Sequence, residues 1–445
     1  MRQTHALLLL AALGAGACSF DLNTNPNSPD EIGDNPSRAQ VSATANGLLI
    51  AFRTDVADMP IDGGILGREM YRFDGSDPRF TAELLHGPLD PGGGAFGGDH
   101  WGEEYGAIRT GNNLLQVLGT AQALTAAEQS ATSGYVKTLQ ALNFLYILNF
   151  HTQDSIPIDV GTDVTATPAP FVTNALAFAH VVALLDQGQT ELAAGGGAFP
   201  FALPAGFAGF DTPSTFSQFN RAIRARVAIY QSQYADALTA LAGSFIDPAG
   251  PLDRGVYMSY GTGAGDFANP LALDPQNGEN FAHPSLQTDA QLQTDGTSLD
   301  RRFLTKVVAR NLQSNDGLSS ALGWIRYPSP TTPIPLIKNE ELILLRAEAN
   351  IGLSDPGSAL PDINTVRTLS GGLPALGGFA DVTAALDELL YNKRYSLMFE
   401  GAFRWVDARH YGRLNTLPID RPTTDPPDVV FSTLPIPNAE TLPRQ

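Results

Sequence analysis

Apolar residues recur at helical spacing along most of the chain, in six blocks. In one block Leu139, Leu142 and Tyr146 follow the repeat of an amphipathic helix. A later block begins near Asn174, a predicted N-cap, and is followed by three glycines, which are a strong stop signal for a helix. The pattern predicts helices over residues 100–118, 126–150, 173–194, 215–241, 337–353 and 383–411.

Two of these blocks predict helical hairpins. In RARVAIYQSQYADALTAL, residues 224–241, the small residues Ala228 and Ala237 allow two antiparallel helices to approach closely, and Tyr230 and Tyr234 fill the turn. Residues 340–367 repeat this arrangement with a helix, a turn and a second helix. The spacing indicates a tetratricopeptide-like array, and an ordinary irregular helical domain is the alternative.

The remaining segments are broken by Pro and Gly. The chain has 44 Gly and 32 Pro, many for a helical protein, and they are dense in 59–98 and 247–335. We expect short extended pieces at most in these two segments. The predicted fold class is therefore mainly α, with helical hairpins, long irregular loops and few short strands.

The N-terminus has the features of an export signal. Arg2 precedes an apolar run and a stretch of small residues that ends at Cys18, the only cysteine in the chain. This pattern predicts a signal peptide over residues 1–17 and lipidation of Cys18, although Ala15 stands where such lipid-attachment motifs usually have Leu. A plain signal peptide with an incidental cysteine, or a buried free thiol, is the alternative.

Composition narrows the function. A net charge of −19 over 445 residues argues against nucleic acid and favours a neutral or cationic ligand. No apolar run after the signal is long enough to cross a bilayer, so a lipid would be the membrane anchor. Seven scattered histidines show no metal-ligand spacing, and no nucleophile, zinc or P-loop motif occurs, so we expect no metal, no cofactor and no catalysis.

Charged residues concentrate near the C-terminus, in 391–414. A continuous helix would place Glu400, Arg404 and Asp407 on one face. A catalytic interpretation pairs the two carboxylates with His410 as a base. A structural interpretation makes Arg404 the centre of an ion network, and we favour it because an arginine between two acids keeps both ionised.

Short motifs also occur in a consistent order along the chain. The first groups are Trp101, Tyr105, Ile108 and Asn112, and then Ile156 to Ile158. The next are Ile334, Pro335, Glu341, Leu344, Ala347, Glu348 and Ala349, followed by NTVR at 364–367. The C-terminal group is Arg394, Leu397, Glu400 and Gly401, then Arg404, Trp405, Asp407 and Arg409, and Pro435, Ile436, Pro437 and Glu440 follow near the end. Together they resemble the SusD/RagB family of outer-membrane nutrient-binding lipoproteins. Ser396 stands where the family signature has its first Glu, and two residues separate Gly401 from Arg404 where one is usual.

The resemblance implies both a fold and a role. The fold is a right-handed scaffold of four tetratricopeptide-like helix pairs in one domain over 18–445, with an N-terminal part to about 300 and a C-terminal part beyond it. The role is capture of an oligosaccharide, or sometimes a peptide, at the outer face of the outer membrane. The implied partner is a SusC-like TonB-dependent transporter that receives the ligand. The resemblance also implies that the chain itself catalyses no reaction.

Sugar rings stack on exposed aromatic side chains, so aromatic residues in loops are the candidate ligand contacts. We expect Trp324 and Tyr327 to form the main platform. Further candidates are Tyr257, Tyr260 and Tyr71. The alternative for each of them is an aromatic side chain that holds its loop to the scaffold.

Three functional classes are open at this point: capture of a nutrient such as a glycan, a surface scaffold that binds peptides or proteins, and a glycosidase with two carboxylates. Aromatic platforms on loops favour sugar, whereas a concave helical groove without loops favours peptide. Nothing in the sequence raises the pKa of one particular acid, as a glycosidase requires.

Overall fold

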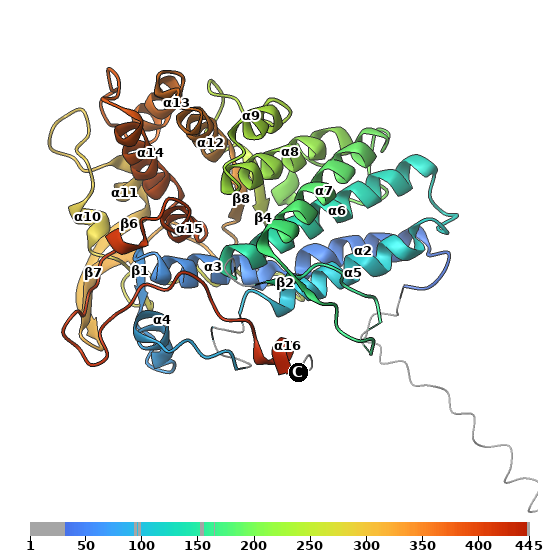
Figure 1. The fold of residues 1–445 in the computed structure, drawn as a ribbon, viewed down its shortest axis with the longest axis horizontal. Helices are drawn as coiled ribbons and strands as arrows, with labels where there is room; N and C mark the ends of the chain where they lie inside the picture. Colours follow the sequence, from blue (N-terminus) through green and yellow to red (C-terminus); the bar gives the residue numbers. More distant parts are fainter. Residues whose placement is uncertain (1–31, 93–95, 97–98, 152–154, 164, 443–445) are drawn as a thin grey trace, which may run out of the picture.

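The computed structural model describes residues 32–92, 96, 99–151, 155–163 and 165–442. The predicted signal peptide and Cys18 lie outside these residues, so both stay predictions. The described part is mainly helical (Figure 1). Its α-helices are α2 (Arg38–Ala51), α3 (Arg53–Leu66), α4 (Glu83–His86), α5 (Gly102–Leu118), α6 (Ala126–Phe150), α7 (Asn174–Ala193), α8 (Pro213–Tyr230), α9 (Tyr234–Ala242), α10 (Ser285–Thr288), α11 (Arg301–Lys306), α12 (Asn339–Gly352), α13 (Pro356–Leu369), α14 (Val382–Leu397), α15 (Phe403–His410) and α16 (Asn438–Thr441).

The strands form one small sheet and two short pairs. The sheet has the antiparallel order β1-β5-β7-β6, and β2 pairs with β3 and β4 with β8. The strands are β1 (Met70–Arg72), β2 (Ile156–Pro157), β3 (Phe171–Val172), β4 (Gly255–Met258), β5 (Asn280–Ala282), β6 (Val307–Asn315), β7 (Leu318–Trp324) and β8 (Ile334–Lys338); the 3₁₀ turns are η1 (Pro78–Phe80), η3 (Ala205–Phe207) and η4 (Leu414–Thr416).

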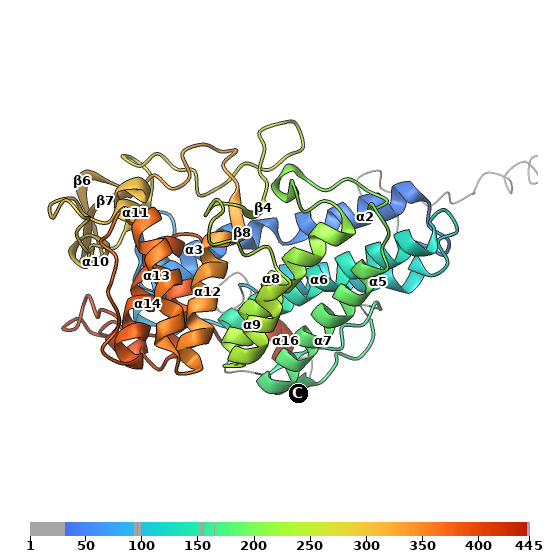
Figure 2. The same cartoon turned by 90° about the horizontal axis from the view of Figure 1, so that it is seen from above.

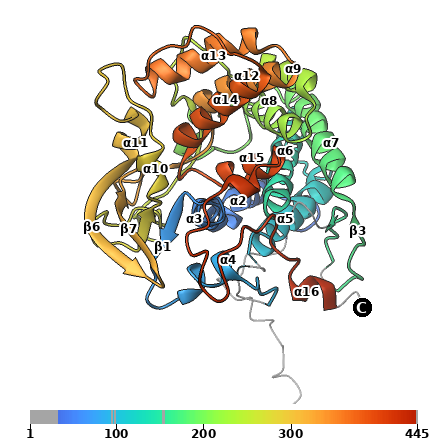
Figure 3. The ribbon, with the colours of Figure 1, turned by 60° about the vertical axis from the view of Figure 1, so that its left-hand side comes forward.

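The helices form a curved array in which each packs on the next. α5 packs on α6, α6 on α7, α7 on α8, α8 on α9, α9 on α12, and α12 on α13, while α2 packs on α5. The array curves around α3 and α15, and the sheet lies at its open side (Figure 3). Sequential packing of helical hairpins is the arrangement that the apolar pattern predicts.

Side-chain caps fix where several helices begin. The Ser37 hydroxyl accepts a hydrogen bond from the backbone N–H of Gln40 at the start of α2, and Thr125 does the same for Glu128 at α6. At α7 the cap is Thr173, which accepts from the backbone N–H of Leu176, so the predicted cap at Asn174 is wrong by one residue.

The predicted hairpin at 215–241 is confirmed. The block divides into α8 and α9 at a turn in which Ser232 has a positive φ of 56°. Ala228 and Ala237 are fully buried where the two helices meet. The next hairpin packs against this one, because a Cβ added at Gly352 of α12 would lie 2.4 Å from the ring of Tyr234. Glycine at 352 therefore allows close stacking of the two hairpins.

Two predicted helices differ from the structure. The block 337–353 begins as strand β8 and becomes helical at Asn339. The block 383–411 is broken between α14 and α15, where Met398 is extended and Phe399 has a left-handed φ of 59°. At this break the Phe399 ring stacks on that of Trp324, with 4.5 Å between the ring centroids.

Several helices, among them α2 and α3, and one β-hairpin lie where the pattern did not predict them. α3 is buried on nearly every face, so it lacks the periodic alternation of an amphipathic helix. β6 and β7 are longer than the short extended pieces we expected in 247–335. They are joined by Asp316 and Gly317, both at positive φ, which is the two-residue turn that Asp-Gly favours in hairpins.

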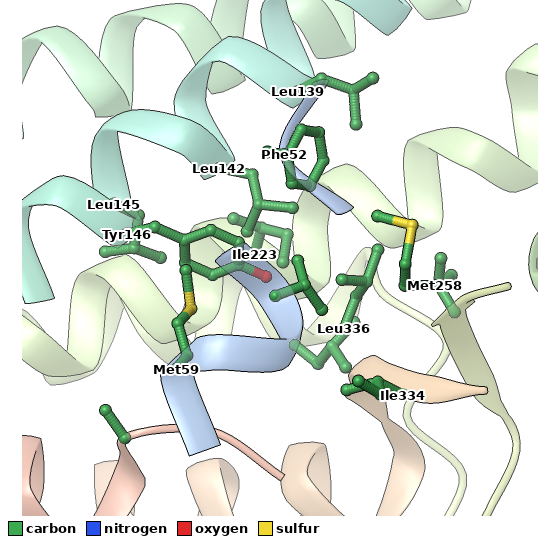
Figure 4. Close-up of a cluster of buried hydrophobic side chains, with 14 of the residues drawn as sticks. Phe52, Met59, Leu139, Leu142, Leu145, Tyr146, Ile223, Met258, Ile334 and Leu336 are labelled. Atoms are coloured by element: carbon green, nitrogen blue, oxygen red, sulfur yellow. The ribbon is translucent and has the colours of Figure 1, made fainter. Parts of the chain in front are cut away.

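A buried apolar cluster joins the helix array to strands β4 and β8. Phe52, Met59 of α3, Leu142 of α6 and Ile223 of α8 pack together with Met258, Ile334 and Leu336 of the two strands (Figure 4). β4 and β8 lie between α8 and the group α12–α14, with long loops over them (Figure 2). The core thus holds rigidly the strand that lines the candidate site.

Candidate ligand-binding site

A cavity of about 510 Å³ lies where the loops cross β4. This volume is within the range of small-molecule sites in proteins. Three segments line it: η3 with the residues that follow it, β4 with its flanking residues, and the approach to β8. The lining residues are Ala205, Gly206, Ala208, Gly209, Phe210, Asp253, Arg254, Gly255, Tyr257, Ser259, Tyr260, Thr331 and Pro333.

Tyr257 is half-buried in the wall of this cavity. Along β4 the side chains of Val256 and Met258 are buried in the core, so the alternation of the strand places Tyr257 on the cavity side. Its hydroxyl donates to the backbone oxygen of Asp253, which fixes the ring, and burial raises the pKa of Tyr257 to about 12. The phenol is therefore neutral at physiological pH.

The floor of the cavity requires glycine at position 206. A Cβ added there would lie 2.0 Å from the backbone oxygen of Tyr257 and 2.8 Å from the Ser259 Oγ. The backbone N–H of Gly206 also donates to that Oγ at 2.7 Å. η3 and β4 are thereby held in direct contact beneath the opening.

Arg254 is the cation of the cavity wall. Its guanidinium lies over the rings of Phe210 and Phe245, 5.6 and 5.7 Å from their centroids. No carboxylate of the described residues pairs with it, so its N–H groups are available to a ligand. The neighbouring Asp253 is exposed, and Thr331 adds a hydroxyl at the rim.

A second aromatic group lies beside the cavity. Tyr260 is only 7% exposed and donates its hydroxyl to the backbone oxygen of Arg53 at 3.0 Å. Its ring centroid lies 6.3 Å from that of Phe267, which is 38% exposed. Arg53 lies over both rings and forms an ion pair with Asp266 at 2.9 Å, which holds the loop of Phe267 in place.

Trp324 and Tyr327 do not form the exposed platform that the sequence predicted, because both side chains are buried. Trp324 is 5% exposed, and its ring stacks on that of Phe399 at 4.5 Å between centroids. Tyr327 is 3% exposed and donates its hydroxyl to the backbone oxygen of Phe399 at 2.9 Å. Both residues hold the loop after β7 to the break between α14 and α15, which is the alternative considered for loop aromatics.

Tyr71 is also a packing residue in this structure. It is 3% exposed, and its ring contacts those of Phe73 and His283. Of the five predicted aromatic contacts, Tyr257 and Tyr260 line the cavity and the other three do not. Arg254 and Phe267 were not predicted as ligand contacts, although the position of Phe267 directly after a glycine-rich loop was a signal for it.

The predicted network centred on Arg404 divides into two networks, and Arg404 belongs to neither. Glu400 lies in the break before α15 and contacts Lys306 at 3.0 Å, Arg326 at 2.8 Å and Lys338 at 2.7 Å. Burial opposes its charge, but the three cations outweigh burial and hold the pKa of Glu400 well below its usual range.

Asp407 belongs to the second network. Lys393 contacts Asp407 at 2.6 Å and Glu348 at 2.9 Å, and all three are buried. With two acids around one lysine, burial raises the pKa of Asp407 to about 7. The first network reaches strand β8 through Lys338, and the second connects α12, α14 and α15. These contacts fit the structural interpretation of Glu400 and Asp407, but the two residues do not share one helical face.

A buried cluster that the sequence analysis did not predict lies between α3 and α5. His100 contacts Asp55 at 2.5 Å and Asp62 at 3.0 Å, and these contacts raise the pKa of His100 against the effect of burial. Glu104 is fully buried beside Asp55, and burial raises its pKa well above the ordinary value. The described residues contain no group of His, Cys, Asp and Glu with the geometry of a metal site.

The described helices include none long and apolar enough to cross a membrane. No protein-family model matches the sequence, and no curated protein matches it either. Solved structures do match over nearly the whole chain. A SusD superfamily protein from Bacteroides vulgatus ATCC 8482 superimposes with a TM-score of 0.68 and 14% identity, over 92% of this chain and 97% of that one.

A second SusD superfamily protein from Bacteroides vulgatus ATCC 8482 has a TM-score of 0.66 at 14% identity and covers 92% of this chain and 98% of its own. A laminarin-binding SusD-like protein has a TM-score of 0.60 at 15% identity, over 90% and 97% of the two chains. At these identities the likeness shows a shared fold. The chain has the SusD fold, which confirms the predicted mainly helical, tetratricopeptide-like class.

Proposed function

We propose that this protein captures a neutral oligosaccharide at the cell surface, in the cavity beside β4, without catalysing a reaction. The observation that carries the proposal is the cavity of about 510 Å³ in which Tyr257, Tyr260 and Arg254 converge. The fold supports it, because structures with this fold include a SusD-like carbohydrate-binding protein and a laminarin-binding one.

The lining suits a sugar. The faces of sugar rings are apolar C–H surfaces that pack on aromatic rings, and their hydroxyls require donors and acceptors. Tyr257 offers a ring, and Arg254, Asp253 and Thr331 offer polar groups at the rim. Phe267 is placed to contact a second sugar unit beyond Tyr260.

The charges support a neutral ligand and a binding role. The protein carries a net charge of −19, which repels anionic polysaccharides over long range. Asp253 is the one acidic residue among those that line the described cavity. Hydrolysis of a glycosidic bond requires a pair of carboxyl groups on either side of that bond, so this lining favours capture over cleavage.

The finer role follows the family resemblance. We propose that a lipid on Cys18 anchors the chain to the outer face of the outer membrane, and that a SusC-like TonB-dependent transporter receives the ligand. A Cys18→Ala variant should then lose incorporation of labelled fatty acid and leave the membrane fraction. Labelling that persists in this variant would refute the anchor.

Isothermal titration of the purified full-length chain in detergent tests the binding site. The ligands are neutral oligosaccharides, including laminari-oligosaccharides, together with a set of short peptides. We expect saturable sugar binding that Tyr257→Ala weakens about tenfold or more, because it removes the ring. Tyr257→Phe is the matched control, and it should retain most of the affinity because the hydroxyl is occupied by Asp253.

The outcomes separate the functional classes. Sugar binding that Tyr257→Ala leaves unchanged would refute the site. Binding of peptides with no binding of any sugar would instead indicate the scaffold function. Release of reducing sugar from a mixture of polysaccharides would refute the absence of catalysis.

A further inference from the structure

A second cavity, of about 230 Å³, lies between α14, α15 and the segment after α15. We name it the α14–α15 pocket. Its lining shares no residue with the cavity beside β4 and contains three arginines. The lining residues are Asp387, Leu390, Tyr391, Arg394, Arg404, Asp407, Ala408, Arg413, Thr416 and Leu417.

Most of the charges around this pocket are already paired. Arg394 forms an ion pair with Asp289 at 2.7 Å, and Arg413 forms one with Asp387. Asp407 is held by Lys393 at 2.6 Å. These pairs leave Arg404 as the remaining charged residue of the lining.

Arg404 has no carboxylate in contact. Its Nη1 donates to the backbone oxygen of Arg68 at 2.7 Å, and its Nε and Nη2 have no partner among the described residues. Glu69 is the acid whose field acts most strongly on it, but no ion pair forms, and burial raises the pKa of Glu69. Arg404 is half-buried and lines the pocket, so a bound anion would replace water at its unpaired N–H groups.

Burial and the neighbouring arginine also favour a bound anion beside Arg404. Burial and the neighbouring Arg394 guanidinium together lower the pKa of Arg404 to about 9. Two guanidinium groups near each other repel, and an anion between them would relieve the repulsion. The pocket volume is too small for an oligosaccharide but ample for an ion of a few heavy atoms.

We propose that the α14–α15 pocket binds a small oxyanion of the phosphate type through the free N–H groups of Arg404. A planar guanidinium presents paired donors that match two oxygens of such an anion. The Arg413 guanidinium lines the same pocket and supplies further donors. The anion is either free inorganic phosphate or the phosphate group of a small ester.

Titration of the full-length chain with inorganic phosphate at constant ionic strength tests this site. We expect saturable binding of one phosphate per chain, weakened about tenfold or more in Arg404→Gln because a charged hydrogen-bond donor pair is lost. Arg79→Gln is the control, since Arg79 pairs with Asp77 and does not line the pocket, and it should leave the affinity unchanged.

A second variant keeps the test independent of folding. Asp387 is more than half exposed and competes for Arg413, so Asp387→Asn should strengthen phosphate binding severalfold without disturbing the core. Methyl phosphate and glucose 6-phosphate distinguish the two sources: tighter binding of an ester than of phosphate identifies an ester ligand, and equal or weaker binding identifies the free ion. Absence of saturable phosphate and ester binding, or unchanged affinity in both Arg404→Gln and Asp387→Asn, would overturn the proposal.

Discussion

Replacing Glu400 with Gln should strongly destabilise the protein. The carboxylate is fully enclosed and contacts Lys306, Arg326 and Lys338 at 3.0, 2.8 and 2.7 Å. An amide of the same shape preserves the packing but removes the negative charge. The three cations then share Glu340, which contacts Lys338 at 3.2 Å, as their remaining buried acid.

The expected loss follows from the cost of an unpaired buried charge. Breaking a buried ion pair by removing one partner costs about 3–5 kcal/mol. Glu340 still compensates part of the charge, and Arg326 is 20% exposed, so water screens it. We therefore expect Glu400→Gln to lower the free energy of unfolding by about 4 kcal/mol at neutral pH.

The loss in the free energy of unfolding should depend on pH because of Lys306. Burial lowers the pKa of Lys306 to about 8 in the folded protein, below its ordinary value. The unfolded chain therefore binds more protons than the folded one above that pKa, so stability rises with pH there. Without Glu400 the folded pKa falls further, and the loss in the variant should shrink as the solution becomes more alkaline.

Urea unfolding followed by the fluorescence of the three buried tryptophans, Trp101, Trp324 and Trp405, measures both effects. Asp236→Asn is the control, because Asp236 is largely exposed and its pair with Arg224 should contribute at most about 1 kcal/mol. A loss in Glu400→Gln no larger than in this control would contradict the role of Glu400 as the counter-charge of buried cations.

Three further outcomes are expected. Trp324→Ala should lower the free energy of unfolding by about 3–5 kcal/mol in the same urea assay and leave sugar affinity unchanged, because the Trp324 ring is in the core. Loss of sugar affinity at unchanged stability would show that Trp324 contacts the ligand. Burial raises the pKa of Glu104 in the folded state, so the native protein should lose stability as the pH rises above the ordinary pKa of a glutamate. Glu104→Gln should lose less in parallel thermal melts, and equal losses would contradict a buried neutral carboxyl. Gly352→Leu should cost about 1–3 kcal/mol, because its side chain collides with the ring of Tyr234, and an unchanged urea midpoint would show that the two hairpins are not in tight contact.

The sequence predicts elements well where one face is apolar and the other polar. α6 matches its predicted bounds, and the hairpin of α8 and α9 follows from small residues at the helix contact. α3 was missed because it is buried on nearly all sides and carries Pro60, so neither its pattern nor its propensity indicates a helix. The break at Phe399 depends on a contact with Trp324, which is distant in sequence.

The candidate site was predicted only in part, for a related reason. Aromatic residues in loops fill either the core or a binding surface, and their local sequence does not distinguish the two. Tyr257 faces the cavity because β4 pairs with β8 and places its neighbours in the core. Arg254 gains its position from the rings of Phe210 and Phe245, which approach it only in the folded chain.

The most direct test of the account is a hydrogen–deuterium exchange map of the full-length chain with and without the tightest-binding oligosaccharide of the titration panel. Bound sugar should slow exchange in 205–210, 253–260 and 331–333, the three segments that line the cavity beside β4. Protection confined to other segments, with these three unchanged, would contradict the claim that this cavity holds the ligand.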